Sequence, residues 1–213
     1  MRRIAIGGDP SANLAALADA VAVISRGGVV AIPTDTLYGL AVDPFSSAAI
    51  SRLFAVKGRA DARAVALIAA DVEQVTAQLG ALPPMAQRLA AAYWPGPLTM
   101  LVARPASIPA QLTGESEQVG VRVPAHDVAR ELCRSCGHLL TATSANISGE
   151  PASDDPDHIA RVFGLSDVEV LLDAGKTPGG PPSTIVSVVG NDIHLVRPGA
   201  ISWDEVQACA QGK

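Results

Sequence analysis

The sequence has few aromatic residues and no excess of positive charge, and both deficits limit its function. Aromatic residues make up only 3% of the 213 residues, which leaves few flat side chains on which nucleic-acid bases could stack. The net charge is −5, so no overall positive field attracts nucleic acid. Lysine occurs only at positions 57, 176 and 213. Any binding of a phosphate-bearing ligand must therefore depend on a local group of basic residues.

Long apolar runs and abundant cysteines are also missing. No run approaches the ~20 residues of a membrane-spanning helix. The start of the chain, Met1-Arg2-Arg3-Ile4, is not followed by the long apolar stretch of a signal peptide. Cysteine occurs at positions 133, 136 and 209 only, and a low, odd count favours a reducing compartment. We therefore expect a cytoplasmic protein without a membrane segment.

The chain is rich in residues that can build a core. Hydrophobic residues make up 48% of the sequence and charged residues 17%, which is typical of a globular protein. A length of 213 residues suits one large domain. We expect a single domain over residues 1–213.

Apolar runs of strand length alternate with amphipathic segments along most of the chain. Strands are expected at 29–32, 65–69, 98–103, 119–124, 139–143 and 168–172, with a hairpin at 184–189 and 193–196. Helices are expected at 11–26, from 46 to just before Lys57, from 71, at 83–93, at 127–136, from about 156 and from 202, with a loop at 105–118. The expected N-caps include Ser11, Ser46, Asp71 and Ser202, and Leu14 and Val162 are expected on buried helix faces. This alternation predicts an α/β domain with a mixed, twisted sheet.

The predicted site is organised around residues 28–40. Residues 29–32 form the buried strand, and Pro33 resists its continuation because it lacks an N–H group. Thr34, Asp35 and Thr36 follow directly, with Tyr38 close behind. Polar side chains at a strand end mark a common position for ligands in α/β sheets, although these side chains equally suit simple turn hydrogen bonds.

Five basic residues favour a ligand site over a simple turn. Lys57 and Arg59 lie one predicted helix further on, and Arg63 follows four residues later. Arg122 lies in a predicted strand and Arg197 ends the hairpin. Guanidinium groups bind phosphate or carboxylate through two parallel hydrogen bonds, whereas lysine binds as a point charge. Each residue alone would suit a solvated surface, but the five together predict a site for an anionic ligand.

Two other motifs are rejected as sites. Residues 174–177 (AGKT) resemble the end of a phosphate-binding loop, but Val170 stands where that motif needs glycine and the prolines at 178–182 prevent the helix that should follow. Cys133 and Cys136 form one pair without a second pair nearby, so a zinc or redox role is not favoured. We expect no metal site built from protein ligands, and no nucleophile elbow that would indicate covalent catalysis is present in the sequence.

Six segments occur in the order typical of one family. They are 33–40 (PTDTLYGL), 57–59 (KGR), 94–99 (WPGPLT), 121–124 (VRVP), 143–149 (TSANISG) and 182–185 (PSTI). On these motifs the chain resembles the YrdC/TsaC-type threonylcarbamoyl-AMP synthases over a core of about residues 13–202, in their short, single-domain form. The resemblance implies an open, twisted mixed sheet flanked by helices, with a concave basic face.

The resemblance also implies an activity. Members of this family condense L-threonine, bicarbonate and ATP into threonylcarbamoyl-AMP and pyrophosphate, with Mg²⁺ accompanying the ATP. A separate transferase complex then passes the threonylcarbamoyl group to tRNA, and a weak contact with tRNA is a further expectation. Fixed cations suit this reaction because negative charge accumulates on phosphate oxygens.

Matching the motifs position by position assigns roles to individual residues. Lys57 and Arg59 are implied to be catalytic. The residues implied in ATP binding are Lys57, Arg59, Arg63, Ser144, Asn146 and Arg197. The residues implied in threonine binding are Thr34, Arg122 and Ser183. Ala60, Ala62 and Ala66 replace residues that are usually Pro, Asp and Pro, and we expect a looser loop there because proline restricts the mobile chain.

Two alternatives remain open from the sequence. A non-catalytic RNA-binding module could use the same concave face, although the scarcity of aromatic residues weighs against it. The second alternative is a carbamoyl-adenylate module like that of hydrogenase maturation proteins. Such a module is normally part of a larger chain with zinc-finger and acylphosphatase parts.

Overall fold

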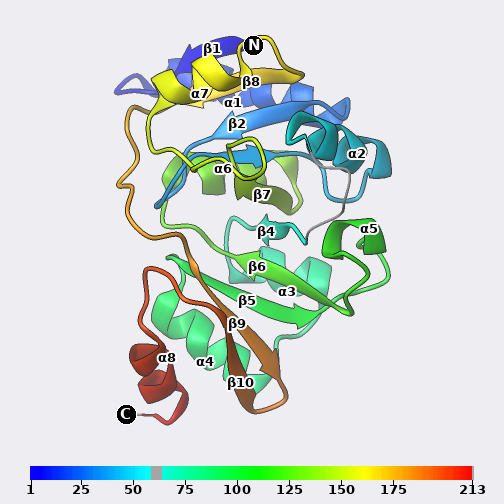
Figure 1. The fold of residues 1–213 in the computed structure, drawn as a ribbon, viewed down its shortest axis with the longest axis vertical. Helices are drawn as coiled ribbons and strands as arrows, with labels where there is room; N and C mark the ends of the chain where they lie inside the picture. The colour runs from blue at the N-terminus through cyan, green and yellow to red at the C-terminus, as the bar shows by residue number, and fades with distance from the viewer. Residues whose placement is uncertain (59–63, 213) are drawn as a thin grey trace.

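The computed structural model describes residues 1–58 and 64–212, and a mixed sheet runs through its whole length (Figure 1). The strands are β1 (Arg2–Ala5), β2 (Val29–Ile32), β3 (Gly39–Ala41), β4 (Ala66–Ile68), β5 (Leu98–Ala103), β6 (Gln118–Arg122), β7 (Leu140–Ser144), β8 (Val168–Asp173), β9 (Thr184–Val189) and β10 (Asp192–Arg197). Their order in the sheet is β1-β8-β2-β3-β7-β4-β6-β5-β9-β10. The sheet contains both parallel pairs such as β2–β8 and antiparallel pairs such as β3–β7. The prediction of a mixed sheet is confirmed.

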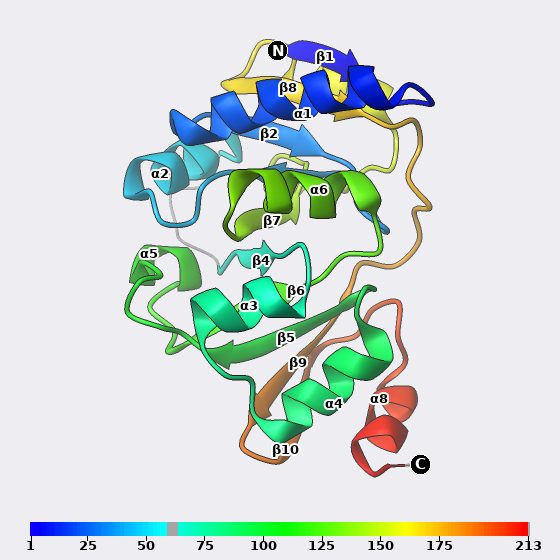
Figure 2. The same ribbon diagram turned by 180° about the vertical axis from the view of Figure 1, so that it is seen from behind.

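Helices flank this sheet on both sides, as expected. They are α1 (Pro10–Ser25), α2 (Ser47–Val56), α3 (Val72–Leu79), α4 (Pro84–Tyr93), α5 (Ala110–Thr113), α6 (Asp127–Cys136), α7 (Pro156–Phe163) and α8 (Trp203–Ala210). Helices α1 and α6 lie next to each other on one face (Figure 2), whereas α7 lies on the opposite face (Figure 1). The sheet is therefore covered from both sides.

Strand β2 is central to this arrangement because it is buried on both faces. Side chains alternate between the two faces of a strand. Val30 and Ile32 belong to the apolar cluster with α1 and α6, while Val29 and Ala31 belong to the cluster on the other side. All four residues are fully buried. This explains why residues 29–32 form a continuous apolar run instead of an alternating one.

Four sequence-based expectations about local structure are wrong. Asp9, and not Ser11, caps helix α1: its side chain accepts from the Ser11 amide, and Pro10 takes the first helical position, which needs no N–H donor. Leu14 is 65% exposed and Val162 is 37% exposed, so neither lies on the buried face of its helix. The segment 105–118 contains the short helix α5 instead of being entirely a loop.

The remaining capping predictions are confirmed. The side chains of Ser46 and Asp71 accept hydrogen bonds at the starts of α2 and α3. Ser202 and Glu205 form a capping box at the start of α8. These caps satisfy backbone N–H groups that have no partner within the helix.

The long segment 174–183 carries the chain from β8 to β9 along the outside of the sheet (Figure 1, orange). It is attached to the turn after β2. The Gly179 amide donates to the Thr36 carbonyl at 2.9 Å, and the Thr177 hydroxyl donates to the same carbonyl at 2.8 Å. The Tyr38 hydroxyl donates to the Gly175 carbonyl at 2.7 Å. These contacts connect the first polar motif with the segment that delivers Ser183.

Two expectations at the level of the whole chain stay predictions. The basic character of the concave face depends partly on Arg59 and Arg63, which lie outside the described residues. The assignment of a single domain to residues 1–213 has no independent test. None of the helices in the described part of the chain has both the length and the apolar character of a membrane span.

Candidate active site

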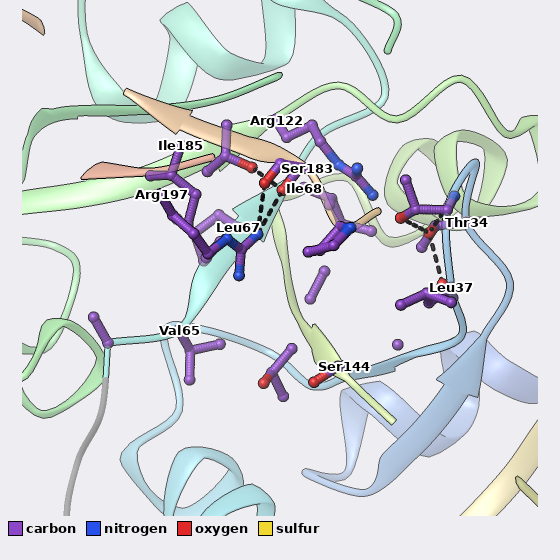
Figure 3. Close-up of a pocket in the computed structure, with 18 of the residues that line it drawn as sticks. Thr34, Leu37, Val65, Leu67, Ile68, Arg122, Ser144, Ser183, Ile185 and Arg197 are labelled. Atoms are coloured by element: carbon purple, nitrogen blue, oxygen red, sulfur yellow. Dashed lines mark hydrogen bonds between the residues drawn. The ribbon is translucent and has the colours of Figure 1, made fainter. Parts of the chain in front are cut away.

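A cleft of about 280 Å³ lies where the ends of several strands meet (Figure 3). Strands β7, β4, β6 and β5 are neighbours in the sheet, so residues at their ends come close together although they are far apart in the sequence. The cleft is lined by five of the predicted site residues, namely Thr34, Arg122, Ser144, Ser183 and Arg197. The polar residues assigned separately to threonine and to ATP therefore share one cavity.

Thr34 combines a place in the cleft with the hydrogen bonds of a turn. Its hydroxyl donates to the Leu37 carbonyl at 2.7 Å and accepts from the Thr36 amide at 3.2 Å. The side chain is buried yet belongs to the wall of the cleft. The sequence left open whether this motif forms a turn or a ligand site. In the structure Thr34 makes the hydrogen bonds of a turn and also lines the cavity.

Two arginines, Arg122 and Arg197, line the cleft among the residues that the structure describes, and Arg122 is the more deeply buried. It ends β6, and its Nη2 lies 3.3 Å from Oδ1 of Asp35. Its side chain is 7% exposed, and that of Asp35 is 9% exposed. Burial lowers the pKa of Arg122, an effect that the negative charge of Asp35 opposes and the positive charge of Arg197 increases. Asp35 belongs to the polar cluster predicted after β2, but the sequence assigned it no role of its own, because an aspartate after a strand equally suits a turn.

Ser183 and Arg197 form a second polar group on the wall. The Arg197 guanidinium donates to the carbonyl of Ser183 at 2.7 Å and to its hydroxyl at 3.2 Å. The Ser183 hydroxyl also lies 2.9 Å from that of Thr99 on β5. Burial lowers the pKa of Arg197. Thr99 belongs to the 94–99 motif but was not predicted as a site residue. In the structure it lines the cleft beside Ser183.

Lys57 and Asn146 lie together, behind the Ser144 end of the cleft. Lys57 follows α2 and is fully buried. Its Nζ donates to the Ser144 carbonyl at 2.5 Å and to both the carbonyl and side-chain oxygens of Asn146, each at 3.0 Å. Neither Lys57 nor Asn146 is among the described residues that line the cleft. The two predicted phosphate-binding motifs thus meet, while Arg59 and Arg63 lie outside the described residues.

The thiols of Cys133 and Cys136 are not activated for metal binding or redox chemistry. The thiol of Cys133 donates to the Ile68 carbonyl at 3.6 Å, and burial raises its pKa. Burial also raises the pKa of Cys136 to about 11. These thiols therefore remain protonated at neutral pH, whereas metal binding needs thiolates. No group of three or more metal-ligating side chains occurs within residues 1–58 and 64–212.

The fold and the site together define an α/β protein with a polar, arginine-containing cleft at the strand ends. The family model for the Sua5, YciO and YrdC proteins, described as "Telomere recombination", matches residues 22–199. The chain belongs to this Sua5/YciO/YrdC family.

Named relatives and solved structures agree with this assignment. The threonylcarbamoyl-AMP synthase of Pyrococcus abyssi is 34% identical over 188 residues, covering 88% of this chain and 55% of the relative. A putative threonylcarbamoyl-AMP synthase of Mycobacterium tuberculosis is 34% identical over 198 residues, covering 93% of this chain and 90% of the relative.

The structure of P. abyssi Sua5 in complex with L-threonine superimposes with a TM-score of 0.88 at 31% identity, covering 98% of this chain and 60% of that one. The chain thus spans little more than half the length of the P. abyssi relative.

Proposed function

We propose that the protein is an L-threonylcarbamoyladenylate synthase, which condenses L-threonine, bicarbonate and ATP to threonylcarbamoyl-AMP and pyrophosphate. The observation that carries the proposal is the buried guanidinium of Arg122 in one cleft with Thr34 and Ser183. These are the residues that the family motifs assign to threonine. Relatives at 34% identity bear the name of this enzyme.

The arrangement of the cleft suits an amino-acid substrate next to a nucleotide. A guanidinium binds a carboxylate through charge-assisted hydrogen bonds, so Arg122 is assigned to the carboxylate of threonine. A related protein, P. abyssi Sua5, was solved with L-threonine. Thr34 and Ser183 add hydroxyl groups on either side of the cavity. Threonine bound here would be held by side chains from three different segments of the chain.

ATP is assigned to the neighbouring part of the same site. Ser144 and Arg197 line the cleft, and Lys57 together with Asn146 lies directly behind Ser144. Arg59 and Arg63 complete the assignment as predictions. In the reaction the threonine amine and bicarbonate combine to a carbamate with loss of water. A carbamate oxygen then forms a bond to the α-phosphorus, and the bond from that phosphorus to the leaving pyrophosphate breaks. The cationic residues would stabilise the charge that accumulates on the phosphate oxygens.

Mg²⁺ is proposed to enter with ATP. The described residues of the cleft wall supply hydroxyl and guanidinium groups but no carboxylate. This donor set fits a magnesium ion held mainly by triphosphate oxygens and water, which is the usual state of Mg²⁺ at nucleotide sites. When bound, the ion would neutralise part of the triphosphate charge.

The remaining assignments follow from this activity. The product would be passed to a separate transferase complex that modifies tRNA, and a weak direct contact with tRNA stays a prediction. A cytoplasmic location is supported by the three free cysteines. An RNA-binding module without catalysis is not favoured, because the relatives are named as synthases.

Pyrophosphate release from ATP, Mg²⁺ and bicarbonate tests the function directly. We expect release that depends on L-threonine, with little release when L-serine replaces it, and a product with the mass of threonylcarbamoyl-AMP. Folded protein that releases no pyrophosphate with threonine would contradict the proposal.

A further inference from the structure

We propose that Asp35 is a positioning residue of this site, whose carboxylate holds the Arg122 guanidinium in place at the cleft wall for the carboxylate of the amino-acid substrate. The inference rests on the proposed function and deepens it. If residues 34–36 formed only a turn, the buried Asp35 carboxylate would have no function, and the inference assigns it one.

The first observation is the burial of the pair. Oδ1 of Asp35 lies 3.3 Å from Nη2 of Arg122, and each side chain is at least nine-tenths buried. Opposite charges interact much more strongly away from water than at the surface. Removing one partner would leave the other as an unpaired buried charge, which is strongly unfavourable. The orientation of Arg122 therefore depends on Asp35 more than a surface arginine would depend on its partner.

The second observation concerns hydrogen bonds that the pair does not make. Arg122 Nη1 and both carboxylate oxygens of Asp35 are buried, and within the described residues none of these atoms has a hydrogen-bond partner. A buried donor without a partner calls for an explanation. Arg122 lines the cleft, whereas Asp35 is not among its described lining residues. An anionic ligand in the cleft would meet the arginine, and Asp35 would act through it.

The third observation is the charge on either side of Arg122. Arg197 lies on the cleft side, where its positive charge opposes that of Arg122. His126 lies near Asp35, and burial lowers its pKa, which keeps the imidazole neutral at pH 7. Arg122 therefore lies between a countercharge, Asp35, which favours its charged form, and a like charge, Arg197, which disfavours it. In the view of Figure 3 the Arg122 side chain extends between Ser183 and Thr34.

The backbone on both sides of Asp35 is held in place. The Thr34 hydroxyl bonds to the Leu37 carbonyl, and the Thr36 carbonyl accepts from Gly179 and Thr177. Asp35 is therefore fixed by its neighbours and can in turn fix Arg122. The segment 174–183 thus contributes to the site both through Ser183 and through this support of the turn.

Steady-state kinetics of pyrophosphate release test the proposal. We expect Asp35→Asn to raise the KM for threonine by at least about tenfold, because a displaced Arg122 guanidinium would lose its charge-assisted hydrogen bond to the substrate carboxylate. We expect kcat and the KM for ATP to change by less than about threefold. Glu169→Gln is the matched control, because it removes a carboxylate from the Arg26 ion pair outside the described cleft wall. It should leave all three parameters unchanged.

A double-mutant cycle separates positioning from general damage. If Asp35 acts only through Arg122, then Asp35→Asn combined with Arg122→Gln should have the same KM for threonine as Arg122→Gln alone. The comparison does not need Asp35→Asn alone, so it stays valid if that variant unfolds. Arg122→Gln leaves the Asp35 charge unpaired, so urea denaturation first establishes that it is folded.

Three outcomes would overturn the inference. The first is an unchanged threonine KM in folded Asp35→Asn. The second is a further increase of that KM when Asp35→Asn is added to Arg122→Gln. Both leave the proposed function intact, because the unmodified protein remains threonine-dependent. The third is unmodified protein without threonine-dependent release, which contradicts the proposed function itself and this inference with it.

Discussion

The ammonium group of Lys57 donates a hydrogen bond to the backbone oxygen of Asn146 at 3.0 Å, across 89 residues of sequence. Two further bonds, to the Ser144 carbonyl and to the Asn146 side chain, complete this contact. The lysine that the family motif marks as catalytic therefore also holds the end of β7. Its replacement should affect the stability of the fold as well as the reaction.

Lys57→Met is expected to abolish threonine-dependent pyrophosphate release and to lower the free energy of unfolding by about 1–3 kcal/mol. The side chain is fully buried, and its replacement removes a charged donor from partly buried oxygen atoms of Ser144 and Asn146, which is costly for a hydrogen bond. Urea denaturation measures the stability, and the pyrophosphate assay measures the activity.

Lys176→Met is the matched control for Lys57→Met. Lys176 pairs with Asp155 at 3.4 Å, but its side chain is 71% exposed, and such surface pairs contribute little to stability. We expect a change of less than about 0.5 kcal/mol and normal activity. Equal effects of the two substitutions would contradict the structural role of Lys57.

Arg122→Gln and Arg197→Gln are expected to impair different substrates. Loss of a charge-assisted hydrogen bond to a substrate weakens binding by roughly tenfold to a hundredfold. Arg122→Gln should therefore raise the KM for threonine, and Arg197→Gln the KM for ATP. Steady-state kinetics with each substrate varied in turn checks both variants. The reverse pattern would show that the assignments of threonine and ATP within the cleft are exchanged.

Tyr38→Phe is expected to lower the free energy of unfolding by about 1–3 kcal/mol, because it leaves partly buried backbone groups without this partner. The Tyr38 hydroxyl donates to the Gly175 carbonyl and accepts from the Ala174 amide. Burial raises the pKa of Tyr38 to about 12, so the hydroxyl stays protonated at neutral pH. Urea denaturation of both proteins gives the difference.

Tyr93→Phe serves as the comparison for Tyr38→Phe. The Tyr93 hydroxyl donates to the Glu205 carbonyl at an exposed position, where water can replace the lost partner. Its effect should be clearly smaller. If the two substitutions cost the same, the attachment of the 174–183 segment through Tyr38 would not be important for stability.

Stability is expected to fall as the pH decreases below about 6.5, in part because of His126. Burial lowers the pKa of His126 in the folded protein, so the unfolded chain binds a proton at this residue more readily. Linkage then favours the unfolded state at acidic pH. The urea midpoint should drop less between pH 7.5 and 5.5 for His126→Asn than for the unmodified protein, and equal drops would remove His126 as a source of the pH dependence.

Much of the secondary structure could be predicted because it depends on neighbouring residues. The apolar periodicity of 127–136 predicted α6, and the capping residues Ser46, Asp71 and Ser202 marked three helix starts. The missed elements are short. Strand β3 has three residues and forms only between β2 and β7, and β1 is an edge strand that pairs with β8 far along the chain. Such elements depend on partners that no local pattern reveals.

The α/β character, the order of the motifs and five of the polar residues that line the cleft could be read from the sequence alone, because these depend on local periodicity and on side-chain chemistry. Tertiary structure decided which side chains meet. It paired Arg122 with Asp35 and Lys57 with Asn146, and it buried all four to different degrees. Burial and long-range pairing set the strength of each charge, and both arise only when the sheet brings distant strand ends together.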